Sequence, residues 1–132
     1  MRQHNANGRA AAEFLQQHRA IKEVFYPGLK DHAQHALAKT QMSGFGGLLT
    51  FDLKGGYRAA EKFLQSLKLV HFASSLGGVS SVAIQPAAMF GEQLSEELLA
   101  QQGITPGLIR LAIGIENTPD LIADLDSALK GL

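Results

Sequence analysis

Hydrophobic residues recur along this chain at the two spacings that distinguish helices from strands. Spacing of three and four residues, which places side chains on one face of a helix, is clearest in two stretches. Their inward positions are Ala11, Phe14, Leu15 and His18 in the first, and Ala60, Phe63, Leu64 and Leu67 in the second. These positions predict a helix near the start of the chain and another over residues 57–67.

Residues that start and stop helices predict three more. A helix over residues 31–41 is expected to be capped by Asp31. Ser95 and Gly103 are expected to bound a fourth helix, with Gly103 in the left-handed conformation of a Schellman ending. Thr118 is expected to be the N-cap of the last helix, with Pro119 at its first helical position.

Alternation of apolar and polar positions predicts the strands. They are expected over residues 21–26, 48–53, 80–84 and 108–114, with a short one at Val70 and Phe72. Strands and helices alternate with short connections, and neither a repeat nor a linker divides the chain. This order is typical of an α/β or α+β fold with four or five strands and helices on one face. We therefore expect residues 1–132 to form a single domain.

The two sides of the expected strands differ in character. The side taken to face the helices carries Leu49, Phe51 and Leu53 in one strand and Ile109, Leu111 and Ile113 in another. The other side is expected to carry Arg110 among small residues, namely Ser81, Ala83, Ala112 and Gly114. A solvated face usually carries more charge and longer side chains. This side is therefore either a thinly decorated solvent face or a surface that receives a ligand or a partner.

Composition narrows the function. The 12 basic and 12 acidic residues balance, so the chain lacks the basic excess that is typical of nucleic-acid binding. It has no cysteine, which excludes disulfides, thiolate metal sites and a cysteine nucleophile. No apolar run approaches the ~18 residues that span a bilayer. The polar N-terminus does not have the pattern of a signal peptide, so a cytoplasmic protein without nucleic-acid or membrane partners is expected.

Three stretches, taken together, resemble the C-terminal domain of the transsulfuration family of pyridoxal-phosphate (PLP) enzymes, which includes cystathionine γ-synthase, cystathionine lyases and methionine γ-lyase. The first is Val24-Phe25-Tyr26-Pro27-Gly28-Leu29, with His32 and His35 just after it. The second is Ser74-Ser75-Leu76-Gly77-Gly78-Val79, followed by Gln85-Pro86-Ala87-Ala88-Met89. The third is Gly103-Ile104, then Leu108-Ile109-Arg110-Leu111-Ala112-Ile113-Gly114-Ile115-Glu116 and Asp120-Leu121-Ile122-Ala123-Asp124-Leu125. Their order and spacing match that domain over nearly the whole chain.

The resemblance implies a mainly antiparallel α+β sheet and a substrate-binding role. In this family, the C-terminal domain holds the α-carboxylate of an amino-acid substrate while PLP acts as the electron sink. By resemblance, Arg110 is the carboxylate clamp, and a guanidinium suits this task because its planar fork can meet both oxygens. Ser75 matches the family serine beside the same substrate. These two residues are the expected substrate-binding residues, and no catalytic, cofactor-binding or metal residue is expected in this chain.

The resemblance also implies what lies outside this sequence. The lysine that bonds PLP and the phosphate site belong to the family's large N-terminal domain, so we expect a fragment that is inactive alone. None of the seven lysines lies in the family's cofactor motif; they are Lys22, Lys30, Lys39, Lys54, Lys62, Lys68 and Lys130. The expected partners are that PLP domain, an amino-acid substrate and further copies in a homotetramer.

Some positions depart from the family pattern, and another class of function stays open. Ser80 stands where the family often has glutamate, and Phe90-Gly91 follows Met89 where it often has threonine and histidine. The substrate is therefore left open among cystathionine, methionine and O-acylhomoserine, as is the choice between elimination and replacement. The alternative is a stand-alone α+β module that binds an amino acid or a protein without catalysis.

Other polar groups favour structural interpretations. His32 and His35 could share a helix face, but no third metal ligand obviously joins them. The glycines at 44, 46 and 47 lead into a strand rather than a helix, which favours a tight turn over a phosphate loop. Glu96 and Glu97 suit the first turn of a helix, and Ser74-Ser75 has no evident histidine and acid partners for a hydrolase. Asp120 and Asp124 are expected on a solvated helix face.

Overall fold

The computed structural model describes residues 1–132 and contains a five-stranded sheet with six helices. The strands are β1 (Ile21–Phe25), β2 (Leu48–Leu53), β3 (His71–Phe72), β4 (Val82–Ile84) and β5 (Leu108–Ala112). The helices are α1 (Arg2–Gln16), α2 (His35–Gln41), α3 (Gly56–Ser66), α4 (Pro86–Phe90), α5 (Glu96–Gln101) and α6 (Thr118–Lys130). The short α4 has no counterpart among the expected helices. The other ten elements correspond to the expected ones.

The strands lie in the order β1-β2-β5-β4-β3, which makes β5 the central strand. Neighbouring strands are antiparallel except for the β3–β4 pair, which is parallel. The fold is therefore α+β with a mainly antiparallel sheet, as expected. No helix is both long and apolar enough to span a membrane.

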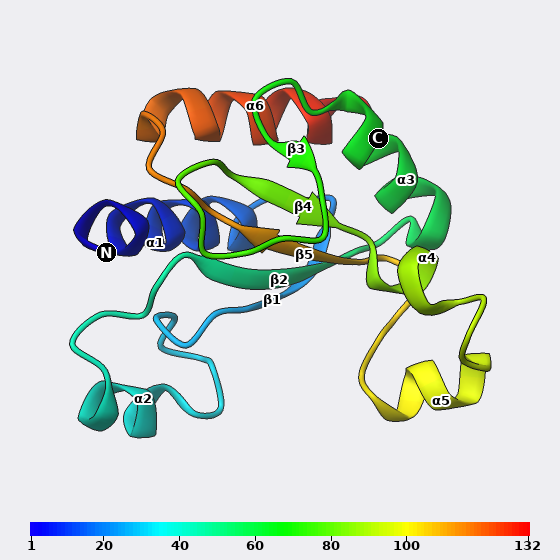
Figure 1. Ribbon diagram of the computed structural model, residues 1–132, viewed down its shortest axis with the longest axis horizontal. Coiled ribbons are helices and arrows are strands. Elements are labelled where there is room, and N and C mark those ends of the chain that lie inside the picture. Colours follow the sequence, from blue (N-terminus) through cyan, green and yellow to red (C-terminus); the bar gives the residue numbers. More distant parts are fainter.

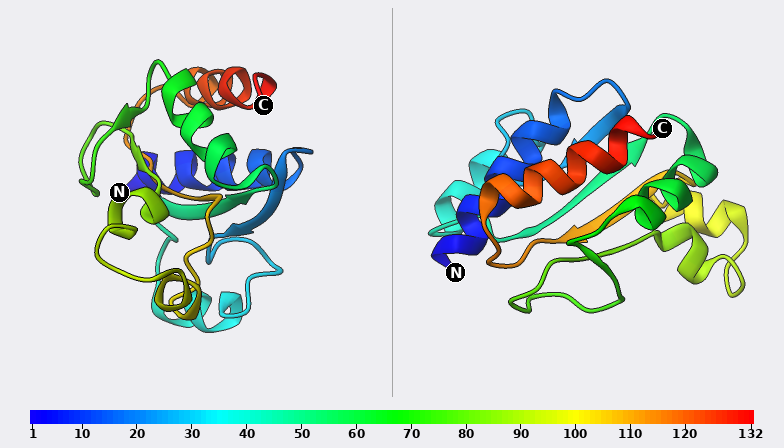
Figure 2. Two further views of the ribbon diagram at one scale, coloured as in Figure 1. Left: turned by 90° about the vertical axis from the view of Figure 1, so that its right-hand side faces the viewer. Right: turned by 90° about the horizontal axis from the view of Figure 1, so that it is seen from above.

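Three helices cover one face of the sheet. Figure 1 and the two views of Figure 2 show α1, α3 and α6 together on this face, whereas α2 and α5 project toward the opposite side. Between the three helices and the sheet lies one cluster of 20 buried apolar residues. The core lies on this side of the sheet, and the side chains of Thr50 and Arg110 on the central strands lie outside it.

The alternation predicted for β2 and β5 is confirmed. Phe51 and Ile109 are partners in the antiparallel register, and both are completely buried in the core. Thr50 and Arg110 are also partners, and both are only partly buried on the opposite face. Period-two alternation therefore places Arg110 on the face that α1, α3 and α6 leave uncovered.

The faces assigned to β4 are wrong. Ala83 pairs with Leu111 and lies in the core, whereas Ile84 pairs with Arg110 on the uncovered face. Ser81, expected beside Arg110, is fully buried. Both Ala83 and Ile84 are nearly inaccessible, so hydrophobicity does not reveal which face of this three-residue strand points to the helices. The neighbour of Arg110 on β4 is consequently Ile84, a larger and more apolar side chain than the expected Ser81 and Ala83.

Helix ends follow the sequence in one place and depart from it in another. Ser95 Oγ accepts from Leu98 N at 3.3 Å, and Ile104 N donates to Leu99 O at 2.9 Å beyond the left-handed Gly103. The predicted cap and Schellman ending of α5 are therefore confirmed.

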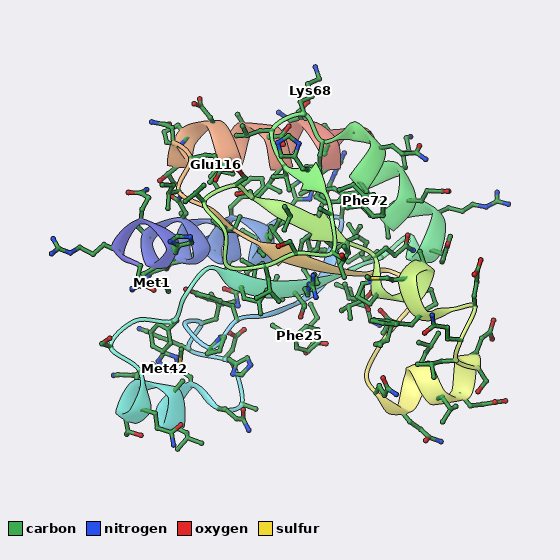
Figure 3. All side chains as sticks on the ribbon, viewed as in Figure 1. Met1, Phe25, Met42, Lys68, Phe72 and Glu116 are labelled. Carbon is green, nitrogen blue, oxygen red and sulfur yellow. The ribbon has the colours of Figure 1, made fainter.

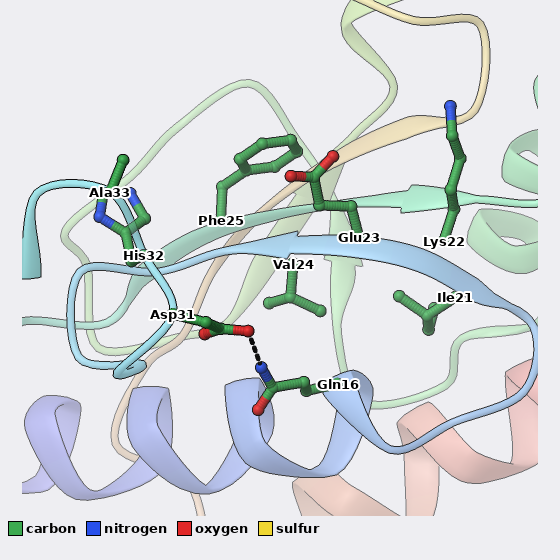
Figure 4. A pocket seen from close by; sticks show the side chains of 9 residues that line it. All are labelled: Gln16, Ile21, Lys22, Glu23, Val24, Phe25, Asp31, His32 and Ala33. Atoms are coloured by element: carbon green, nitrogen blue, oxygen red, sulfur yellow. Dashed lines mark hydrogen bonds between the residues drawn. The ribbon is translucent and has the colours of Figure 1, made fainter.

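Two other predicted caps are wrong: the N-cap of α6 is Asn117 rather than Thr118, which lies inside the helix, and Asp31 does not cap a helix. The helix α2 begins only at His35, after Gln34. The Asp31 carboxylate instead accepts from the side chain of Gln16, a contact drawn in Figure 4. The helix predicted over residues 31–41 thus starts four residues later, because the tertiary contact with Gln16 engages the expected cap.

The glycine-rich turn before β2 is explained by close packing, as expected. A Cβ on Gly47 would lie 2.6 Å from the carbonyl oxygen of Ile113, too close for any other residue without movement of the backbone. The hydroxyl of the buried Tyr26 donates to Gly46 O at 2.8 Å. Burial raises the pKa of Tyr26 above its ordinary value, because the ionised phenolate would lose its hydration.

Asp124 overturns the expectation of a solvated side chain. Asp124 is buried, and its carboxylate accepts from the backbone N–H groups of Lys68, Leu69 and Val70 at 2.8 to 3.0 Å. These three donors belong to the connection between α3 and β3. One helical carboxylate therefore fixes the path of that connection, an arrangement that no local spacing in the sequence indicates.

Replacing Asp124 with alanine should lower the free energy of unfolding by about 3 kcal/mol, because three backbone donors lose a charged acceptor. The measurement is equilibrium urea unfolding. Asp120→Asn, on the exposed first turn of α6, is the matched control and should cost less than about 1 kcal/mol. Equal losses in the two variants would contradict the anchoring role.

The raised pKa of Tyr26 predicts a loss of stability at alkaline pH. Above pH of about 10 the unfolded chain releases the Tyr26 proton while the folded chain retains it, so unfolding becomes more favourable as pH rises toward the folded pKa. Tyr26→Phe should remove this part of the decline, and Tyr57→Phe should not. The check is the free energy of unfolding of all three proteins between pH 8 and pH 11, where a Tyr26→Phe profile parallel to wild type would refute the assignment.

Candidate functional site

The uncovered face of the sheet carries one row of side chains at the level of Arg110. Strand register places Phe25, Thr50, Arg110 and Ile84 side by side on β1, β2, β5 and β4. Figure 3 shows Phe25 projecting from the sheet on the side away from α6. Leu48 extends the same face and is 45% exposed. Arg110 is thus the charged group in a row whose neighbours are aromatic, aliphatic or a hydroxyl.

The guanidinium of Arg110 is held by the backbone of the loop between β3 and β4. Its Nη2 donates to the carbonyl oxygens of Ser74 at 2.9 Å and Ser75 at 3.2 Å. Neither Nε nor Nη1 makes a hydrogen bond within the chain, and no carboxylate lies within ion-pair distance of the side chain. The site therefore contains an oriented cation with donors that face no internal partner.

The structure brings Arg110 and Ser75 together, although not through the serine hydroxyl. The contact uses the main-chain carbonyl of Ser75, and the residue itself is exposed. The carbonyls of Ser74 and Ser75 orient the guanidinium. The Ser75 hydroxyl has no partner in the chain. This geometry gives a cation, a free hydroxyl and the turn at Gly77 on one exposed surface. It is chemically suited to an anionic ligand with planar, bidentate geometry, such as a carboxylate.

The loop that carries Ser75, residues 73–81, is fixed at its other end by Glu116. One carboxylate oxygen of Glu116 accepts from Ser81 N at 2.5 Å, and the other accepts from Ser81 Oγ at 2.8 Å. The backbone oxygen of Glu116 accepts in turn from Asn7 on α1 at 2.8 Å. Sequence reasoning assigned no role to either residue. The available signals were an acid shortly after an apolar strand and an asparagine one turn before Ala11 on the buried face of a helix.

The other polar candidates are committed to structural contacts. His35 Nδ1 donates to Pro27 O at 2.7 Å, and its ring stacks on Phe45. His32 Nδ1 instead accepts from Gln34 N at 3.2 Å. No group of three histidine or acidic side chains is close enough to hold a metal ion. The two histidines are therefore engaged separately.

A hollow of about 330 Å³ lies beside the edge strand β1 and is shown in Figure 4. Its charged groups are largely occupied. Lys22 Nζ lies 3.1 Å from Oδ2 of Asp52, and the other carboxylate oxygen of Asp52 accepts from the Thr105 hydroxyl. Asp31 accepts from the side chain of Gln16. Of the charged side chains that line this hollow, only Glu23 is without a partner in the chain, whereas Nε and Nη1 of Arg110 are both free. The Arg110 face is therefore the stronger candidate site.

The lysines of this chain do not form a site for an aldehyde cofactor. All seven are exposed, and two of them form internal ion pairs, Lys22 with the buried Asp52 of β2 and Lys130 with Asp126 of α6. A lysine that forms a Schiff base is typically activated by desolvation in a pocket or by a neighbouring cation. The surroundings of these seven lysines therefore do not fit a Schiff base with an aldehyde cofactor.

Comparison with known proteins identifies the family of this chain. The model of the family described as "Cys/Met metabolism PLP-dependent enzyme" matches residues 1–130. The chain is 42% identical over 130 residues to L-methionine gamma-lyase from Fusobacterium nucleatum subsp. polymorphum, and the match covers 98% of this chain and 33% of that protein. It is 46% identical over 130 residues to cystathionine gamma-lyase from Sus scrofa, with 98% of this chain and 32% of that protein covered. Cystathionine beta-lyase from Lactococcus lactis subsp. cremoris is 42% identical, with 98% and 34% covered. The chain spans about a third of the length of the curated relatives it matches.

Proposed function

The chain belongs to the Cys/Met metabolism family of PLP-dependent enzymes, and from this membership we propose that it is the C-terminal, substrate-binding domain of a transsulfuration-type enzyme. In this role Arg110 binds the α-carboxylate of the amino-acid substrate and Ser75 adds its hydroxyl to the polar lining. The observation that carries the proposal is a guanidinium on the uncovered sheet face with no carboxylate partner and with Nε and Nη1 unused.

The environment of Arg110 favours a carboxylate ligand. In the intact enzyme a second domain over the uncovered face would exclude water from Arg110, and an ion pair gains more where water screens it less. The carbonyls of Ser74 and Ser75 fix the guanidinium plane before the ligand arrives. A carboxylate that meets this fork is held in one orientation, which limits the orientation of the bonds at the neighbouring carbon.

The proposal assigns the cofactor to a different part of the enzyme. Because all the lysines of this chain are exposed, a PLP domain outside this sequence supplies the cofactor, and the uncovered face meets that domain. The chain by itself neither holds PLP nor turns over substrate. The complete enzyme is proposed to be cytoplasmic and homotetrameric.

The proposed substrates are sulfur amino acids or O-acylated homoserine. The relatives include a methionine γ-lyase and cystathionine γ- and β-lyases, which all act on molecules with an α-amino-acid end. Arg110 recognises that shared end and so does not choose among them. Selection falls instead to groups that meet the rest of the substrate, and Ser80 and Phe90 are the departures from the family pattern within this chain.

A chimera tests the clamp directly. This chain should replace the matching third of the Fusobacterium nucleatum methionine γ-lyase, and the chimera should be active. Arg110→Ala in it should then lower kcat/KM about 100-fold, because a bidentate charged contact to the substrate is lost. Steady-state kinetics with L-methionine provide the measurement.

Two further variants sharpen this test. Arg110→Lys retains the charge without the fork and should recover only part of the loss. Arg58→Ala removes an exposed arginine of α3 and should leave kcat/KM unchanged. An active chimera in which Arg110→Ala keeps the original kcat/KM would show that the carboxylate is bound elsewhere.

The isolated chain separates this proposal from a stand-alone amino-acid-binding module. An exposed ion pair is worth at most about 1 kcal/mol, whereas a Kd of 1 mM needs about 4 kcal/mol. The chain alone should therefore bind L-methionine more weakly than about 1 mM by calorimetry, and gel filtration should separate it from PLP. Micromolar binding of the amino acid, or PLP retained one to one, would favour the stand-alone module.

A further inference from the structure

The loop of residues 73–81 is exposed, and polar contacts rather than burial hold it in place. Every residue from Ser74 to Ser80 is exposed, and Leu76 and Val79 are exposed to 55% and 66%. Burial therefore does not define the conformation of this loop. Its position depends on polar contacts at three points, which lie at its start, near its tip and at its end.

The start of the loop is held by Arg110 itself. Both bonds, to the carbonyls of Ser74 and Ser75, come from the single nitrogen Nη2. A carboxylate that binds the guanidinium through an edge that includes Nη2 competes with these carbonyls for that nitrogen. The start of the loop consequently loses some of its anchoring when the ligand binds.

The end of the loop has an anchor that does not involve the ligand. Ser81 is fully buried, and both its backbone N–H and its hydroxyl donate to the carboxylate of Glu116. The Ser81 hydroxyl also accepts from Gly114 N at 2.8 Å, and Ile115 N donates to Val79 O at 2.9 Å. Four hydrogen bonds thus join residues 79–81 to the turn between β5 and α6.

Glu116 is fixed by a separate support. Asn7 is 1% exposed and donates to the carbonyls of Gly114 and Glu116 at 3.1 and 2.8 Å. Its own oxygen accepts from Gln3 and Thr118, so all four of its hydrogen-bonding sites are satisfied. Figure 3 shows Glu116 near the start of α6. The carboxylate of Glu116 therefore extends from a rigid junction of α1, β5 and α6 to the loop.

The tip of the loop has a weaker contact with α1. His4 Nε2 lies 3.1 Å from Gly78 O, and because a carbonyl can only accept, Nε2 carries the proton. The other ring nitrogen is buried without a partner. This single bond to a half-buried residue contributes less than the paired bonds of Glu116. Glu116 is consequently the principal anchor of the loop when Arg110 turns toward a ligand.

From these contacts we propose that Glu116 is a positioning residue for the substrate-carboxylate site. It keeps residues 73–81, and with them the Ser75 hydroxyl and the Ser74 and Ser75 carbonyls, in place while Arg110 exchanges its bonds. The proposal rests on the carboxylate-binding function assigned to Arg110. It adds that the clamp is preorganised by an acid that does not touch the substrate.

The first part of the test concerns the loop in the full 132-residue chain. Glu116→Ala should lower backbone order parameters over residues 74–80 from about 0.85 toward 0.6, while those of β5 remain unchanged. Glu116→Gln keeps one acceptor and should have a smaller effect. Ser81→Ala, which removes the loop hydroxyl from the same contact, should act in the same direction. Glu97→Ala, on the exposed face of α5, is the control. Unchanged loop order in Glu116→Ala would overturn the proposal.

The second part measures coupling to Arg110 in the active chimera. Glu116→Ala should raise KM about ten-fold and change kcat less than about two-fold, and Glu116→Gln should restore part of the KM. In the double variant Arg110→Ala/Glu116→Ala, the KM should be no higher than in Arg110→Ala alone, because the two residues act on one contact. If Arg110→Ala raises KM and Glu116→Ala does not, Glu116 is structural only and the clamp stands. If Arg110→Ala has no effect on KM or kcat/KM, the clamp and the positioning role are both wrong.

Discussion

The proposed function depends on where one charged side chain, Arg110, lies on the central strand of the sheet. Strand β5 has neighbours on both sides, and alternate residues of it fill the core beneath α1, α3 and α6. An arginine on that strand avoids the cost of a buried charge only on the other face. The fold places Arg110 there without an acidic partner, so its charge is available for a ligand. The proposed substrate clamp depends on this placement.

The structure around Arg110 fixes the loop that lies beside it. The 73–81 loop is fixed by Arg110 at one end and by the Asn7–Glu116–Ser81 contacts at the other. The exposed lysines provide nothing for PLP. The chain spans about a third of its curated relatives, and we propose that the PLP site lies in another part of the enzyme. One part of such an enzyme can hold the substrate while another supplies the chemistry.

Much of the fold could be predicted because its signals are local. The period-two alternation of β5 placed Arg110 opposite the core, and the cap and glycine of α5 indicated both of its ends. The errors arose where distant contacts decide the outcome. The face of β4 could not be read because Ala83 and Ile84 are both buried. Asp124 and Glu116 bind groups 35 to 56 residues away in the sequence, and Asp31 is engaged by α1. No local spacing reveals such partners.

The central claim is most directly tested by a crystal structure of the intact enzyme that contains this domain, with a carboxylate-bearing substrate analogue bound. We expect both carboxylate oxygens to lie about 2.7–2.9 Å from nitrogens of the Arg110 guanidinium, beside the Ser75 turn. An analogue whose carboxylate contacts a different cation, with Arg110 still bound only to the carbonyls of Ser74 and Ser75, would contradict the account.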